Sequence, residues 1–310
     1  MYKFLRSLVW KIINSAVKLC LEVFVVNRRV RRILKGDFAK FYLRKYVARG
    51  GVNEKKNIDS LHTSEPYKIW QYWEQGLDSA PDIVKACLDS VERYRGDIER
   101  IIITPQNIRD YVHIPEYIYE LKEKGIIKLA HFSDILRTYL LIEHGGCWID
   151  ATVLLTAPLP DYVTKSDLFV FRADEKADLD GLNMASYFLG AGVNVNKNEN
   201  KILLDVRDVL ESYWRENNFL INYFMFLHAF TMVALNNKDI WDKVPFYSFI
   251  PVQQLQSELV NQFDATRWEQ LKAITSIHKL TYKQKVMTKK KDVELEGTFY
   301  EAIIKGKIYE

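Results

Sequence analysis

Apolar and polar positions follow two alternating periods from about residue 66 onward. Short apolar or aromatic runs predict strands, and apolar residues spaced three or four apart predict helices between them. This alternation predicts an α/β fold with a central, mainly parallel sheet flanked by helices, and a more helical C-terminal part. The predicted strands are 67–73, 101–104, 147–155, 167–172 and 187–193, and the predicted helices are 81–91, 115–124, 132–144, 201–217 and 219–235.

Changes in composition divide the chain into four parts. Residues 1–50 form a basic and apolar arm, and residues 51–65, rich in Gly, Asn and Lys, are typical of a linker. Residues 66–285 hold the α/β pattern and are expected to fold as one domain. Residues 286–310 are expected to be a C-terminal tail.

The N-terminal arm has the pattern of an amphipathic helix. Residues 4–26 are mostly apolar, and their polar residues recur every three or four positions, along one stripe of a helix. A bilayer span needs about 20 apolar residues with few charges, whereas Lys11, Lys18 and Glu22 lie inside this stretch. A helix lying in the membrane interface therefore fits better.

The charge of the arm supports the same interpretation. Residues 1–49 hold thirteen Lys and Arg against two acids, a balance that attracts an anionic leaflet. No small-residue cleavage site of a secretory signal is recognisable, so we expect a retained arm and a peripheral protein on the cytoplasmic face of the membrane. Packing of the arm on the protein's own core or on a second subunit remains an alternative. Nucleic-acid binding is least favoured, because no recognised binding module accompanies the basic cluster, and no nucleic-acid partner is expected.

The overall composition excludes several classes of protein. The 310 residues are 48% hydrophobic and 13% aromatic with only 13 Gly and 8 Pro, which excludes collagen-like chains and extensive disorder. The three Cys include no Cys-x-x-Cys pair, so neither a disulfide framework nor a thiolate zinc site is indicated. A reducing compartment fits this cysteine content best.

The clearest candidate chemistry lies between residues 133 and 150. Asp134 and Arg137 are three residues apart, so they share a helix face and can form an ion pair. The turn at 145–146 is Gly-Gly, which lets a ligand approach the backbone closely. Asp150 lies inside a predicted apolar strand, where a divalent cation would offset its desolvation. Spacing alone equally fits structural roles, in which Asp134 stabilises its helix start and Asp150 lies near a strand end.

A family resemblance favours the functional alternative. The run 131–141, continued through 145–153, resembles the core signature of the capsular polysaccharide synthesis proteins. That family belongs with the family 32-like glycosyltransferases, which carry a DxD-like sugar-binding region. The similarity extends upstream to 68–73 and downstream to 276–283. The resemblance implies a GT-A-type, Rossmann-like fold and transfer of a sugar from a nucleotide sugar.

The resemblance also implies roles for individual residues. Asp150 and Asp134 are implied as catalytic, and Asp150 and His278 as ligands of Mn²⁺ or Mg²⁺ on the diphosphate. A metal and a nearby cation would stabilise the charge that develops on the leaving nucleoside diphosphate. The residues implied to bind the nucleotide sugar are Trp70, Gln71, Asp134, Arg137, Gly145, Gly146 and Lys279.

Several positions keep structural alternatives open. Thr152 stands where a full DxD motif has its second acid, which leaves metal dependence undecided. Asn222 stands where the family commonly has an acid, and an amide cannot act as a base. Asn222 and His228 are candidates for the acceptor side, although the apolar surroundings of His228 favour a buried core histidine. His278 equally fits a surface histidine, and Trp70 a core aromatic.

The sequence thus predicts a hexosyltransferase. The expected donor is a UDP-sugar, and the expected acceptor is a polyprenyl-diphosphate-linked oligosaccharide of capsule or other surface polysaccharide synthesis. Retention of configuration is expected by a front-face mechanism, since no pair of carboxylates suited to double displacement is evident. The alternative is a catalytically silent scaffold that binds membrane and nucleotide sugar.

Overall fold

The computed structural model describes residues 2–24, 28–50, 66–173, 184–193, 201–283 and 294–309. The predicted linker at 51–65 and the predicted boundary between 285 and 286 lie outside these ranges.

Five strands form a central sheet in the described part of the chain, in the order β2-β1-β3-β6-β5. β1 pairs in parallel with β2 and β3, and β6 pairs antiparallel with β3 and β5. Four of these strands therefore run in one direction and only β6 runs in the other, which confirms the predicted mainly parallel α/β fold. The strands are β1 (Lys68–Tyr72), β2 (Glu99–Ile103), β3 (Gly146–Ile149), β5 (Leu168–Arg172) and β6 (Met184–Ala191).

The predicted strand 147–155 is two strands with a turn between them. β3 ends at Ile149, and the chain turns at 150–152, where the Val153 amide donates to the Asp150 carbonyl over 2.9 Å. It continues as β4 (Val153–Leu155), which pairs antiparallel with β7 (Ile277–Lys279). The prediction of one strand was wrong here. A carboxylate inside a strand covered on both faces would be buried without a partner, and the turn brings Asp150 to the edge of the sheet instead.

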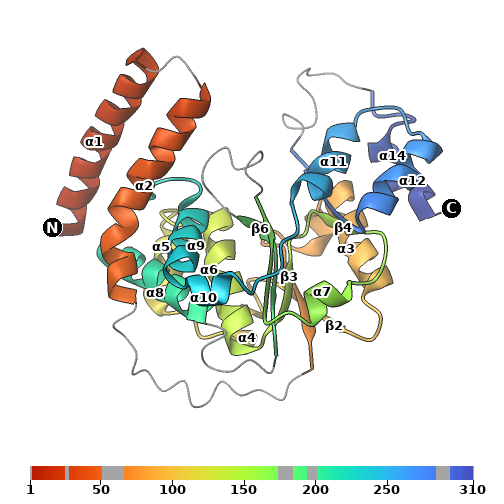
Figure 1. Ribbon diagram of the computed structural model, residues 1–310, viewed down its shortest axis with the longest axis horizontal. Coiled ribbons are helices and arrows are strands. Elements are labelled where there is room, and N and C mark those ends of the chain that lie inside the picture. The colour runs from red at the N-terminus through yellow and green to blue at the C-terminus, as the bar shows by residue number, and fades with distance from the viewer. Residues whose placement is uncertain are drawn as a thin grey trace.

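Helices cover both faces of the sheet (Figure 1). One face carries α5 (Glu116–Glu123), α6 (Leu129–Glu143), α8 (Lys201–Glu216) and α9 (Met225–Asn236), with the short α4 (Ile108–Tyr111) and α10 (Lys238–Trp241). The other side carries α3 (Asp82–Tyr94), α11 (Ile250–Glu258), α12 (Ala265–Ile274) and α14 (Phe299–Ile304). The remaining short elements are η1 (Leu77–Ser79), α7 (Asp161–Thr164) and η2 (Lys307–Tyr309). The predicted helix 219–235 begins only at Met225.

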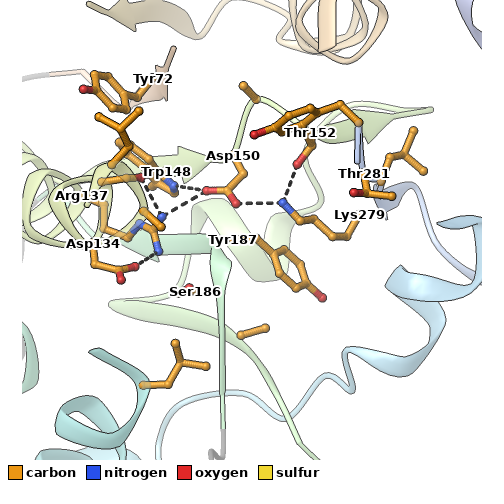
Figure 2. Close-up of a pocket in the computed structure, with 18 of the residues that line it drawn as sticks. Tyr72, Asp134, Arg137, Trp148, Asp150, Thr152, Ser186, Tyr187, Lys279 and Thr281 are labelled. Carbon is orange, nitrogen blue, oxygen red and sulfur yellow. Dashed lines mark hydrogen bonds and ion pairs between the residues drawn. The ribbon is translucent and has the colours of Figure 1, made fainter. Parts of the chain in front are cut away.

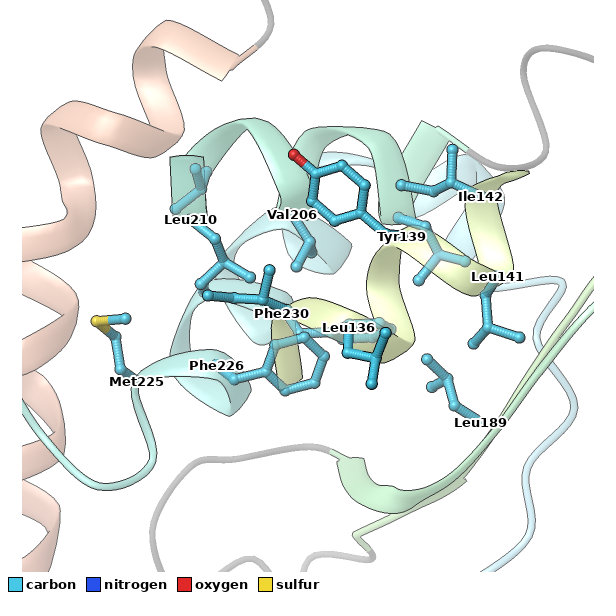
Figure 3. Packing of buried hydrophobic residues seen from close by; sticks show 14 of the residues in the cluster. Leu136, Tyr139, Leu141, Ile142, Leu189, Val206, Leu210, Met225, Phe226 and Phe230 are labelled. Carbon is cyan, nitrogen blue, oxygen red and sulfur yellow. The ribbon is translucent and has the colours of Figure 1, made fainter. Parts of the chain in front are cut away.

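Helix α6 lies at the centre of the larger core. Its Leu136 is fully buried and packs near Phe226 and Phe230 of α9 and Leu189 of β6 (Figure 3). The helix ends at the Gly-Gly turn, where Gly146 has φ 89°, and a Cβ there would lie 2.3 Å from the Lys68 carbonyl oxygen. Only glycine permits β3 to start so close to β1. The turn thus fixes α6 against the strand that leads to Asp150.

The N-terminal arm forms two helices, α1 (Tyr2–Phe24) and α2 (Arg28–Gly50). α2 packs against α8 and α9, and its Leu43 and Tyr46 are fully buried in the same core as α6. The predicted division of the chain at residue 50 therefore differs from the structure, since α2 belongs to the packed body. Glu216 of α8 accepts hydrogen bonds from Arg6, Lys45 and Arg49, a group that we call the arm cluster.

Helix α1 leaves much of its apolar surface exposed. Its Trp10 is buried and stacks on Phe38 and Phe219, at ring-centre distances of 5.3 and 5.2 Å. Seven other apolar residues of this helix are exposed: Leu5, Leu8, Val9, Ile12, Ile13, Leu19 and Val23. None of the described helices is both long enough and apolar enough to cross a bilayer.

The predicted C-terminal tail is partly a core element. Phe299 and Ile303 of α14 are almost completely buried and pack in a cluster with α3 and α12. Thr298 caps this helix by accepting from the Glu301 amide. Residues 294–309 therefore complete the side of the sheet opposite α6, and the expectation of a tail is corrected for them.

Candidate functional site

A cavity of about 700 Å³ opens at the edge of the sheet where β1 and β3 end. Its wall includes Asp134 and Arg137 of α6, Asp150 and Thr152 of the turn after β3, and Lys279 of β7. Ligands of open α/β sheets bind outside the carboxyl ends of parallel strands. The structure therefore brings the central group of predicted site residues together at the place where this fold class binds ligands.

Asp150 is the centre of a group that we call the cavity cluster: Asp150, Arg137 and Lys279. Asp150 Oδ1 accepts from Trp148 Nε1 at 2.8 Å and from Arg137 Nη2 at 3.2 Å. Asp150 Oδ2 accepts from Lys279 Nζ at 2.9 Å, and the same ammonium donates to Thr152 Oγ1 at 2.5 Å. Figure 2 shows these side chains converging from α6, the turn and β7.

Arg137 joins the helix to the turn. Its Nη1 donates to Asp134 Oδ1 at 2.6 Å, and its Nη2 also donates to Ser133 Oγ at 3.0 Å. The guanidinium carbon lies 4.9 Å from the ring centre of Trp148. The arginine side chain is only 4% exposed, so its charge acts in a poorly screened environment. The ion pair predicted from the three-residue spacing is present.

The two carboxylates of the site have opposite pKa shifts. Burial raises the pKa of Asp134 to about 7, Arg137 opposes this shift, and the charge of Asp150 adds to it. Burial also disfavours the charged form of Asp150, but Lys279 and Arg137 outweigh it and hold the pKa of Asp150 below its usual value. Asp150 is therefore a permanent anion at neutral pH, whereas Asp134 exchanges a proton near pH 7.

Four residues predicted to contact the nucleotide sugar do not line the cavity. Trp70 is fully buried and its Nε1 donates to the Gly145 carbonyl at 2.8 Å, on the side of β1 that faces α4 and α6. Gln71 is also fully buried, and its Oε1 lies 3.4 Å from an Arg100 nitrogen. Gly145 and Gly146 form the turn at the opposite end of β3 from Asp150. These predictions are corrected: the four residues pack and turn the chain.

His278 does not face Asp150. Alternation along β7 turns Lys279 toward the cavity and His278 to the other side, where its ring centre lies 5.9 Å from that of Trp268. Its Nε2 is 3.5 Å from Thr156 Oγ1, and burial lowers its pKa to about 4. His278 therefore does not line the cavity beside Asp150, where the predicted metal ligand was expected, and its alternative as a surface residue was wrong, since it is fully buried.

The predicted acceptor-side residues also have other roles. Asn222 Oδ1 accepts from the Phe224 amide at 2.8 Å, so this side chain holds the turn before α9. His228 is 1% exposed, and burial together with the charge of Lys40 lowers its pKa to about 4. Neither residue lines the cavity, whereas Tyr223 and Phe224 do. The acceptor-side prediction is corrected for both, and the alternative of a core histidine holds for His228.

The cavity also contains residues that the sequence did not mark. Ser186 and Tyr187 of β6 form part of the wall, and the Lys279 ammonium lies 5.3 Å from the Tyr187 ring centre. Gln253 and Gln256 of α11 line another part. No motif marks these residues, because they come from elements far apart in the sequence. The only signal in the sequence was the alternation of side chains along β6, and the predicted strand included Tyr187 but not Ser186, because it began at residue 187.

The residues around Asp150 do not form a typical site for a divalent cation. Both oxygens of Asp150 accept from nitrogen donors, and Thr152 supplies a hydroxyl that already accepts from Lys279. Mg²⁺ and Mn²⁺ favour carboxylate and other oxygen ligands. Within the described ranges, no three His, Cys, Asp or Glu side chains come together as a possible metal site. The expected Mn²⁺ or Mg²⁺ therefore does not fit this arrangement.

Comparisons with known proteins agree with the predicted family. The family described as "Capsular polysaccharide synthesis protein" matches residues 22–303. No curated protein matches the chain. Among solved structures, the chain is similar to "PaToxG Glycosyltransferase", with 14% identity and a TM-score of 0.33, over 90% of this chain and 96% of that chain. The family match includes α6, the Gly-Gly turn and Asp150, so the predicted resemblance is confirmed.

Proposed function

This chain belongs to the family of capsular polysaccharide synthesis proteins, and from that premise we propose that it is a glycosyltransferase that uses a nucleotide sugar, most simply a UDP-sugar. The observation that carries the proposal is the cavity at the carboxyl ends of β1 and β3, where Arg137 and Lys279 flank Asp150. Two cations face one permanent anion, Asp150, and one acid that is ionised only in part at neutral pH, Asp134, so positive charge is left for a diphosphate. The hexose acceptor is a polyprenyl-diphosphate-linked oligosaccharide of surface polysaccharide synthesis.

The reaction places charge where these cations lie. The bond from the anomeric carbon to the β-phosphate oxygen breaks, and its electron pair stays on that oxygen. Arg137 and Lys279 stabilise the resulting negative charge, a type of stabilisation that is commonly the largest contribution to catalysis. The acceptor hydroxyl oxygen forms the new bond to the anomeric carbon, and its proton passes to the leaving diphosphate. Because attack and departure then share one face of the sugar, configuration is retained.

The walls of the cavity supply surfaces for the other parts of the donor. Trp73 and Tyr282 line it, with their ring centres 5.6 Å apart in an edge-on arrangement, and provide an aromatic surface for the nucleobase. Asp134 lies on the opposite side of Arg137 from Asp150, where its carboxyl group can bond a sugar hydroxyl. Arg137 donates hydrogen bonds to both Asp134 and Asp150, so we do not assign either carboxylate as a covalent nucleophile.

The experiment that tests this proposal measures nucleoside-diphosphate release from a panel of nucleotide sugars without acceptor. We expect slow hydrolysis of one donor, and its loss in Asp150→Asn, because the amide no longer holds the two cations. Lys165→Gln is a matched control, since that exposed lysine pairs only with Asp161 on α7 among the described contacts. Binding of a donor without release, with added lipid-linked oligosaccharide acceptors as well, would instead favour the silent scaffold.

The membrane-facing surface in this proposal is the exposed face of α1. Its apolar residues are highly accessible, with Ile12 at 62% and Leu19 at 63%, and α1 is the outermost helix on this side of the molecule, with α2 between it and α8 and α9 (Figure 1). The basic residues of the arm add attraction to anionic lipid. This combination supports peripheral attachment at the cytoplasmic face, where polyprenyl-linked acceptors are available.

Point substitutions on α1 test the attachment without disturbing the core. We expect the double variant Ile12→Gln, Leu19→Gln to sediment far less with anionic liposomes, because it removes inserted apolar area from exposed positions. Ile274→Gln on α12 is the control, since Ile274 is 52% exposed on another face. Equal sedimentation of the double variant and wild type would contradict attachment through α1.

A further inference from the structure

We infer that the Lys279 ammonium takes the place of the divalent cation, so that the donor's diphosphate binds and departs without a metal ion. The inference rests on the proposed glycosyltransferase function and specifies how the leaving group is stabilised. Lys279 Nζ lies 2.9 Å from Asp150 Oδ2 and 2.5 Å from Thr152 Oγ1. These are the first and third positions of the DxD-like motif, and one ammonium bridges both.

The charge balance of the site favours an ammonium over a divalent ion. Thr152 contributes no negative charge, and Asp150 is the one permanent anion in contact with Lys279 and Arg137. A divalent ion at the same two oxygens would lie within a few ångströms of the ammonium, where charges of the same sign repel strongly at low dielectric. Asp134 pairs with Arg137 but is ionised only in part at neutral pH, because burial raises its pKa to about 7. The two monovalent cations are therefore not fully balanced, and positive charge remains available to the diphosphate.

The backbone holds Lys279 in this position. β7 pairs with β4 so that residue 279 lies opposite Val153, and the Leu280 amide donates to the Thr152 carbonyl at 2.8 Å. The turn that carries Asp150 and the strand that carries Lys279 are thus joined by main-chain hydrogen bonds on both sides of the contact. The lysine side chain is still 19% exposed, so a ligand in the cavity can reach it.

Lys279 contacts the leaving group as the donor's glycosidic bond breaks. When the bond between the anomeric carbon and the β-phosphate oxygen breaks, the electron pair remains on the diphosphate, and the Lys279 ammonium donates a hydrogen bond to it. The Asp150 carboxylate accepts from the same ammonium at 2.9 Å and holds it at this place in the cavity. Charge-assisted hydrogen bonds of this kind are among the stronger ones in proteins.

The first test measures binding of UDP, GDP and CDP by calorimetry, in EDTA and in Mn²⁺. We expect one of them to bind wild type with affinities that differ by less than about threefold between the two conditions, and Lys279→Met to lose at least about tenfold in EDTA. Lys165→Met is the matched control, because Lys165 is an exposed lysine that pairs with Asp161 on α7 and does not line the cavity. We expect it to bind the diphosphate within about twofold of wild type.

The outcomes separate this inference from the proposed function. Binding that requires Mn²⁺ and disappears in EDTA would overturn the role of Lys279 while leaving the glycosyltransferase proposal intact. No binding of any diphosphate under either condition would overturn both. Binding in EDTA that Lys279→Met leaves unchanged would also overturn the inference, provided that circular dichroism shows the variant folded.

A second test follows Mn²⁺ itself by electron paramagnetic resonance. We expect the spectrum of Mn²⁺ mixed with the diphosphate that binds in EDTA to be the same with and without the wild-type protein. The double variant Thr152→Asp, Lys279→Ala restores a second acid and removes the ammonium, so we expect it to bind Mn²⁺. Wild-type binding of Mn²⁺ that is lost in Asp150→Asn would contradict the inference.

Discussion

The described structure contains two clusters in which several cations surround one carboxylate, and the two carboxylates lie in different environments. In the cavity cluster, Asp150 accepts from Arg137, which is 4% exposed, and from Lys279, which is 19% exposed. In the arm cluster, Glu216 is 34% exposed, and two of its partners, Lys45 and Arg49, are 43% and 57% exposed, whereas Arg6 is 15% exposed. The two groups use the same pairing of charges. Only the first lies in a cavity and retains cations that a ligand can reach.

The difference indicates that the place of a charge cluster, at a cavity or on a mostly exposed helix surface, decides its role more than the identity of its pairs does. Exposed ion pairs are screened by water and contribute up to about 1 kcal/mol each. A buried charge that loses its partner costs about 3–5 kcal/mol, because it remains desolvated. The arm cluster therefore fastens α1 and α2 to α8, and the cavity cluster forms a preorganised site for an anion.

The largest expected effect is that of Arg137→Met. Removing this charge leaves Asp134 and Asp150 without their shared partner, so we expect a loss of about 3–5 kcal/mol in the free energy of unfolding. Nucleoside-diphosphate release should fall by at least about 100-fold. Urea unfolding and the release assay measure the two effects.

A conservative variant and a matched arginine sharpen this prediction. Arg137→Lys keeps the charge but loses the fork that reaches both carboxylates, so it should fold and still release little diphosphate. Arg6→Met, in the arm cluster, should cost stability but leave release near the wild-type rate. Equal losses of release in Arg137→Met and Arg6→Met would remove the distinction between the clusters.

A smaller effect is expected in the pH dependence of stability, with opposite signs at the two clusters. Burial raises the pKa of Asp134 to about 7. The unfolded chain loses this proton near pH 4, so stability from Asp134 is lost as pH rises from about 4 to 7, by up to about 1.4 kcal/mol per pH unit. Partial burial disfavours the charged form of Glu216, but hydrogen bonds from its arm partners outweigh it and lower its pKa to about 2. Stability from Glu216 is present above about pH 4.5 and is lost as pH falls toward 2.

Thermal unfolding of Asp134→Asn and Glu216→Gln between pH 3 and 8 measures these slopes. Relative to wild type, Asp134→Asn should gain stability as the pH rises from about 4 to 7, because asparagine has no proton to lose. Glu216→Gln should lose its disadvantage as the pH falls below about 4.5. A pH-independent difference for Asp134→Asn would mean that the pKa of Asp134 is the same in the folded and the unfolded chain, and would contradict the raised value.

The smallest expected effect is that of salt on Glu216→Gln. At neutral pH this substitution should cost about 1 kcal/mol or less per exposed pair, and the cost should shrink at 1 M NaCl, where the Debye length falls to about 3 Å. Diphosphate release should not change. If the loss of stability in Glu216→Gln were the same at low and high salt, the ion pairs of the arm cluster would behave as buried pairs, contrary to this prediction.

Much of the fold followed from the sequence because its cause is local. The spacing of Asp134 and Arg137 predicted their ion pair, and the Gly-Gly turn marked the end of α6. Apolar runs predicted the strands, and their alternation with helices predicted the mainly parallel sheet. The family motif then identified Asp150, which lines the cavity as expected.

Tertiary structure decided which way the side chains face and which charges meet. Lys279 and His278 are neighbours in the sequence, and only the pairing of β7 with β4 turns the lysine toward Asp150 and the histidine away. The packing of α2 into the core depends in the same way on residues about 170 positions further along the chain, such as Asn217 beside Tyr46. The sequence by itself determined most of the elements, the family and the residues of the central motif. Only the structure decided that an ammonium lies between Asp150 and Thr152, because long-range pairing brings that charge to the site.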